Sequence, residues 1–125
     1  LHAHLDNSGT PVEINAAIAG TFENGVAFTI NGCGESHKSC DGYALFMGTE
    51  GILQVGMWGH YLRQTTGGIG HHGKWEEVPY GEGTPAWVNF LKVLKGETEN
   101  PCPPEVGLRF SEFMDTVREA AEWSA

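Results

Sequence analysis

The sequence is poor in basic residues and in long apolar segments. Its 125 residues include 7 Lys or Arg against 16 Asp or Glu, which gives a formal net charge of −9. A chain with this balance lacks a basic stripe, so we expect neither nucleic acid nor an anionic membrane as a partner. Its apolar runs are much shorter than the roughly 20 residues that span a bilayer, which excludes a membrane helix.

Cysteine is also scarce, and an odd set of three, Cys33, Cys40 and Cys102, cannot all pair internally. This favours a reduced chain in a cytoplasmic protein. The chain does not begin with the basic and then apolar segments of a secretory signal. Its first residue is Leu1 and not an initiator Met, so we expect a piece of a longer protein. Apolar residues make up 40% of the chain, and its length fits a single domain over 1–125.

The first two thirds of the chain have the patterns of strands. Alternating, β-branched or apolar segments, most of them bounded by turn residues, predict strands at 1–6, 12–22, 26–32, 43–47, 52–57, 60–64 and 74–78. Asn24-Gly25 separates the second strand from the third, and this dipeptide is typical of a two-residue type I′ hairpin turn.

That two-residue turn also predicts which side chains share a face of the sheet. It puts Val26, Phe28 and Ile30 on the same face as Ala17 and Ala19, and Ile14, Ile18 and Phe22 on the other. Both faces would then be apolar, although a sheet with one face in water is apolar on one side only. A second copy laid against the uncovered face would hide it, so we expect a homo-oligomer, in its simplest form a dimer.

The last third changes to a helical period. Apolar residues recur at i, i+3, i+4 and i+7 over 87–94, after Thr84-Pro85 as a helix start and before Gly96 as a stop. A longer helix is predicted from Pro104 through Ala121. Strands followed by helices predict an α+β fold, with a mostly antiparallel open sheet and two C-terminal helices packed on one face.

Residues 68–73 match G-x-G-x-x-G letter by letter. A dinucleotide site needs a buried strand before these glycines and a helix that begins within them, so that the helix N-terminus holds the pyrophosphate. Here β-like residues 74–78 follow instead. We therefore interpret the match as a loop and not as a cofactor site.

Cys33, His37 and Cys40 supply three zinc-compatible ligands within a short segment, and Cys102 or another His is available as a fourth. Structural zinc sites usually contain two paired knuckles, and this segment provides half of one such pattern. We therefore expect a loop with free thiols and no metal. A zinc-stabilised interaction domain is the alternative that these residues leave open.

Four short segments occur in a recognisable order: F-E-N-G-V at 22–26, G-T-E-G-I-L at 48–53, Trp87 with Phe90-Leu91, and E-N-P-C-P-P-E-V-G-L-R at 99–109. Each is weak alone. In series, over roughly 5–123, they resemble the C-terminal domain of the Gfo/Idh/MocA family, named for glucose–fructose oxidoreductase, inositol dehydrogenase and rhizopine catabolism.

The resemblance implies an NAD(P)-dependent parent oxidoreductase that acts on a sugar, cyclitol or related polyol. In this family the Rossmann domain precedes a sheet domain that shapes the substrate pocket and joins subunits. The family's Glu-Lys-Pro motif, with its catalytic Lys, and its Asp-x-x-x-His pair do not occur in this sequence. We therefore expect no catalytic residue and no cofactor-binding residue in this chain, with NAD or NADP held by the parent enzyme.

What remains for this chain is contact with substrate. The candidates are the aromatic and imidazole groups nearest its long loops, namely Trp58, His60, His71, His72 and Trp75. Trp stacks on sugar faces and His hydrogen-bonds hydroxyl groups, although core aromatics and surface histidines would give the same pattern. The alternative function is a free-standing, non-catalytic binding or assembly module of the same fold.

Overall fold

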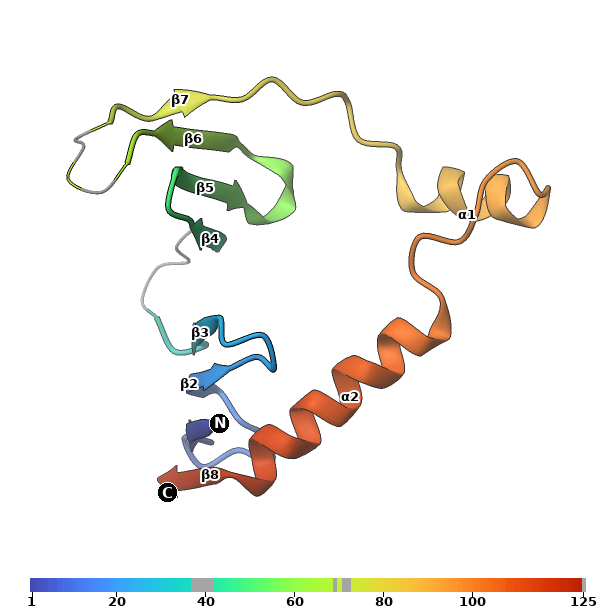
Figure 1. Cartoon of the computed structure of the whole chain (residues 1–125). Coiled ribbons are helices and arrows are strands. Elements are labelled where there is room, and N and C mark those ends of the chain that lie inside the picture. The colour runs from blue at the N-terminus through green and yellow to red at the C-terminus, as the bar shows by residue number, and fades with distance from the viewer. Residues whose placement is uncertain (37–41, 69, 71–72, 125) are drawn as a thin grey trace. The chain divides into compact units, whose positions relative to one another are not determined.

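The structure, a computed structural model, describes residues 1–36, 42–68, 70 and 73–124, apart from the side chain of Trp58 (Figure 1). Within these residues the chain forms two helices and eight strands, arranged in two mostly antiparallel four-stranded sheets. The predicted α+β class is confirmed, with two sheets in place of one. The chain divides into two compact units, Leu1–Lys38 with Glu99–Ala125, and Ser39–Thr98.

The first unit pairs the two ends of the chain in one sheet. Its strands are β1 (His2–Asp6), β2 (Asn15–Thr21), β3 (Ala27–Cys33) and β8 (Ala121–Ser124), in the order β3-β2-β1-β8. β8 runs parallel to β1, and the other pairs are antiparallel. The helix predicted through Ala121 ends at Glu119, because the following residues pair with β1.

Helix α2 (Pro104–Glu119) covers one face of this sheet. Its Val117 is 0% exposed and packs against Leu5, also 0% exposed, and Ile18. Phe113 of the helix adds a ring contact to Phe28, with 6.1 Å between centroids. These apolar positions recur at the strand and helix periods, and their contact forms the core of the unit.

The loop between β2 and β3 differs from the predicted type I′ turn. Phe22 N–H donates to Val26 O at 2.9 Å and Gly25 N–H donates to Phe22 O at 2.9 Å, so the loop spans Glu23 to Gly25. A type I′ turn requires positive φ at two residues, whereas Gly25 at 84° is the one in this loop. The predicted loop was therefore one residue too short. The observed loop is a type I turn followed by a left-handed glycine.

This extra loop residue reverses the predicted faces. Ile18 pairs with Ile30 and Gly20 with Phe28, so the large apolar side chains of β3 share the α2 face with Ile18. Ala17 and Ala19 pair with Asn31 and Thr29 on the opposite face. A shift of one residue exchanges the two faces of a strand, and the prediction of two apolar faces was wrong for this reason.

The second unit contains an antiparallel sheet and a helix. The strands are β4 (Tyr43–Met47), β5 (Gly51–Gly56), β6 (Leu62–Thr66) and β7 (Glu76–Glu77), in chain order across the sheet. A 3-10 turn, η1 (Met57–Gly59), joins β5 to β6.

Helix α1 (Ala86–Leu94) also belongs to the second unit. Pro85, not Thr84, occupies its N-cap position, so the predicted start was one residue early. Gly96 ends the helix as predicted, with a φ of 73°. Its N–H donates to Val93 O at 3.0 Å and Glu97 N–H donates to Lys92 O at 2.9 Å, which is the Schellman arrangement.

Candidate functional site

A polar and aromatic cluster lies on one face of the second sheet, where β5 pairs with β6. Gln54 of β5 stands directly opposite Arg63 of β6 in the antiparallel register. Arg63 Nε donates to Gln54 Oε1 at 2.8 Å, and Gln54 Nε2 donates to Tyr61 Oη at 3.3 Å. Gln54 is 6% exposed, so its amide is buried with both its oxygen and its nitrogen paired.

Two aromatic rings complete this cluster. The guanidinium carbon of Arg63 lies 5.0 Å from the ring centroid of Tyr61 and 4.9 Å from that of Trp75, both within cation–π range. Trp75 remains 43% exposed. We call Gln54, Tyr61, Arg63 and Trp75 the Arg63 cluster.

The local sequence explains how these side chains meet. Tyr61 and Arg63 are two residues apart and therefore point to the same face. Gly56 N–H donates to Tyr61 O at 2.9 Å, which sets Gly56 opposite Tyr61. A Cβ at position 56 would lie 3.0 Å from two carbons of the Tyr61 ring, so the absence of a side chain there lets the ring lie over the strand.

Trp75 is the predicted substrate-facing residue that the structure places in the Arg63 cluster. Trp58 lies in η1, and His60 follows that turn as an exposed residue. His71 and His72 lie outside the described residues. The glycines at 68, 70 and 73 are followed by strand β7 rather than by a helix.

Sequence reasoning missed Gln54, Tyr61 and Arg63. One signal was available, because Gln54 is a polar residue within the apolar strand segment I-L-Q-V. A buried polar side chain needs a partner, which the sequence does not name without the strand register. The pairing of β5 with β6 identifies that partner as Arg63.

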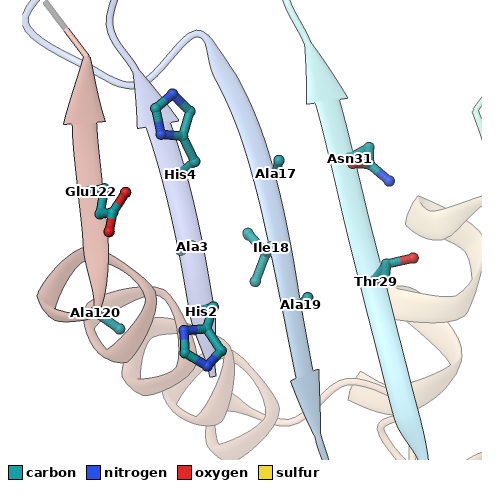
Figure 2. Close-up of a pocket in the computed structure, with 10 residues that line it drawn as sticks. All are labelled: His2, Ala3, His4, Ala17, Ile18, Ala19, Thr29, Asn31, Ala120 and Glu122. Carbon is teal, nitrogen blue, oxygen red and sulfur yellow. The ribbon is translucent and has the colours of Figure 1, made fainter.

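A second feature is a shallow depression of about 380 Å³ on the face of the first sheet opposite α2. Figure 2 shows Ala17 and Ala19 between polar side chains that stand on the same side of the sheet, namely His2, His4, Thr29, Asn31 and Glu122. His4 Nε2 lies 3.2 Å from Ser124 Oγ. The depression therefore has small apolar residues of β2 in its middle and hydrogen-bonding groups of the neighbouring strands around them.

Two carboxyl groups of the first unit have perturbed titration. The pKa of Asp6 is lowered, chiefly because Asn15 Nδ2 donates to it at 2.9 Å and also because Ser8 N–H donates at 3.0 Å. Arg118 Nη2 donates to Glu13 Oε1 at 2.6 Å. This hydrogen bond lowers the pKa of Glu13 and raises the pKa of Arg118. These groups tie the loops around β1 and β2 to each other and to α2.

The described residues contain no group of three or more His, Cys, Asp or Glu side chains that could hold a metal ion. Cys33 and Cys102 are free and exposed, while His37 and Cys40 of the proposed zinc segment lie outside the described residues. Among the described residues, none of the helices combines the length and the hydropathy of a membrane-crossing segment.

The described residues have an α+β fold of two mostly antiparallel sheets with C-terminal helices. No protein-family model matches the sequence, and no curated protein matches it. A solved structure from Thermotoga maritima, described as a "putative oxidoreductase", has the same fold, with a TM-score of 0.77 and 23% identity. The match covers 95% of this chain and 37% of that one, so this chain spans little more than a third of its neighbour's length.

Proposed function

We propose that this chain is the C-terminal, substrate-binding and oligomerisation domain of an NAD(P)-dependent oxidoreductase acting on a sugar, cyclitol or related polyol. The observation that carries the proposal is the fold likeness over 95% of this chain to a protein described as an oxidoreductase. That protein is long enough to hold a further domain, since the match occupies 37% of it. The serial order of motifs at 22–26, 48–53 and 99–109 supports the same assignment.

In this proposal the chemistry is divided between two domains. A nicotinamide bound by the Rossmann domain accepts the hydride, and the acid–base residues of the parent move the proton. The Arg63 cluster of this chain contributes substrate contacts. The exposed part of the Trp75 ring offers a surface for the C–H groups of a polyol, and the guanidinium of Arg63 offers donors to its oxygens.

Reduction of NAD⁺ or NADP⁺ by the full-length protein, assayed against a panel of sugars, cyclitols and sugar acids, tests this function. We expect turnover with at least one of them. Trp75→Ala should raise KM for that substrate, whereas Trp87→Ala, at a 67% exposed position on α1, should leave it unchanged. No turnover with either nucleotide, together with no Glu-Lys-Pro motif in the upstream coding sequence, would favour the free-standing binding module.

We also propose that two copies associate through the face of the first sheet opposite α2. Of the face predicted to carry Phe28 and Ile30 with Ala17 and Ala19, it keeps the two alanines, because Phe28 and Ile30 share the α2 face with Ile18. It combines small residues, Ala17 and Ala19, which permit close approach, with the imidazoles of His2 and His4 and the carboxylate of Glu122. A two-fold axis would let an imidazole of one copy hydrogen-bond the carboxylate of the other. The exposed thiols of Cys33 and Cys102 support a reducing, cytoplasmic compartment.

A further inference from the structure

Arg63 has features that set it apart from a surface arginine. The chain carries 16 acidic residues, yet the ion pairs among its described residues involve Lys95 and Arg118 and not Arg63. Glu77 lies directly opposite Arg63 on β7 and does not form an ion pair with it. Arg63 is instead half-buried and held by neutral groups.

The hydrogen bond to Gln54 determines which donors of Arg63 remain for a ligand. Nε is used, because it donates to Gln54 Oε1 at 2.8 Å. Gln54 is fixed in turn, since its Nε2 donates to Tyr61 Oη. The two terminal nitrogens, Nη1 and Nη2, form a fork whose N–H groups match the two oxygens of a carboxylate or the oxygens of a phosphate.

The rings of Tyr61 and Trp75 restrict the guanidinium further, at 5.0 Å and 4.9 Å from their centroids. A side chain already ordered in this way loses little conformational entropy when a ligand binds. The partly exposed Trp75 ring beside the fork adds a surface for the carbon skeleton of the same ligand. The fork and the ring together suit a molecule with an anionic end and a polyhydroxylated chain.

We infer that the Arg63 cluster is an oxyanion-recognition site, and that the substrate of the parent enzyme is a polyol bearing a carboxylate or phosphate rather than a neutral one. The identification of the ligand as the substrate of an enzyme rests on the proposed function. The binding site itself stands on the geometry of Gln54, Tyr61, Arg63 and Trp75.

Calorimetric titration of the full-length protein without nucleotide tests this site independently of turnover. The probes are gluconate, glucose 6-phosphate and neutral glucitol. We expect gluconate or glucose 6-phosphate to bind and glucitol to bind much more weakly. Arg63→Met should weaken the anion by roughly 10- to 100-fold, the equivalent of one or two hydrogen bonds to a charged group. Arg109→Met, at an exposed position on α2, should not change its binding.

Arg63→Lys keeps a positive charge near both rings but lacks the fork. It therefore serves as a second variant for the same measurement if Arg63→Met fails to fold. We expect it to weaken anion binding less than Arg63→Met does. Gluconate and glucose 6-phosphate distinguish a carboxylate from a phosphate, and Arg63-dependent binding of either supports the site. Equal binding of glucitol, equal binding by the Arg63 and Arg109 variants, or no binding of any probe would overturn it. Anion binding without NAD(P)⁺ reduction would leave the site standing and reject the proposed function.

Discussion

At the scale of single residues, Leu5 contributes most visibly to the packing of the first unit. Its side chain is 0% exposed and contacts the core formed by Ala3, Ile18 and Val117. We expect Leu5→Ala to lower the free energy of unfolding by about 2–5 kcal/mol, because it removes buried methyl groups and leaves a cavity. Val12→Ala, at a 59% exposed position, should change it by less than about 0.5 kcal/mol. Denaturant unfolding measures both, and equal effects would contradict this description of the core.

The Glu13–Arg118 pair predicts a dependence of stability on pH. The hydrogen bond from Arg118 lowers the pKa of Glu13 from its ordinary 4.5, so folding favours the ionised carboxylate. The resulting stability is fully present above pH 4.5 and is lost as the pH falls through the lowered pKa, while Arg118 stays charged.

Glu13→Gln should therefore lower stability at pH 7 and reduce the change in stability between neutral and acidic pH. Thermal unfolding across this range is the measurement. Glu23→Gln, in the exposed loop between β2 and β3, is the matched control. If both variants show the same pH dependence as the unchanged protein, the pair does not contribute to folding.

At the scale of elements, the loop from Glu23 to Gly25 determines the faces of the first sheet. Gly25 has a φ of 84°, a conformation that a residue with a Cβ adopts at a cost. We expect Gly25→Ala to destabilise the protein by roughly 1–2 kcal/mol. Gly32→Ala, in β3 with open space around the added Cβ, should be neutral or stabilising. Equal stabilities of the two variants would argue against a left-handed glycine at position 25.

Elements that depend on local sequence could be predicted, and those that depend on distant partners could not. The apolar segment 43–47, followed by the turn residues 48–51, predicted β4 with its observed bounds, and Gly96 predicted the end of α1. β8 was missed because its partner β1 lies at the other end of the chain. A short segment directly after a helix has no pattern that distinguishes it from a continuation of that helix. Asn24-Gly25 predicted a hairpin, but two loop lengths are compatible with that dipeptide, and the choice between them sets the register.

The residues of the candidate site divide in the same way. Trp75 could be named as a candidate because tryptophan suits sugar binding whatever its neighbours are. Arg63 and Gln54 were not found, because their importance comes from the β5–β6 register that places them opposite each other. The composition shows that basic residues are few. Only the fold distinguishes Arg63, which is held by an amide and two aromatic rings, from a basic side chain in solvent.

At the scale of the whole molecule, the proposed association through the face of the first sheet opposite α2 can be tested directly. Ala19→Arg places a long charged side chain in the depression and should convert a dimer into monomers. Glu23→Arg introduces the same side chain in the β2–β3 loop and should leave the dimer intact. Light scattering after size exclusion measures the mass. A monomer for the unchanged protein at tens of micromolar, or a dimer for both variants, would contradict the proposed interface.

We propose above that this chain serves the substrate side of an enzyme whose nicotinamide is bound by another domain. Titration of NADH and NADPH, followed by nucleotide fluorescence, against the full-length protein and against the 125-residue chain tests it most directly. We predict saturable binding of one nucleotide at micromolar concentration by the full-length protein, and none by the chain. Saturable binding by the chain itself, or no binding by the full-length protein, would contradict the claim.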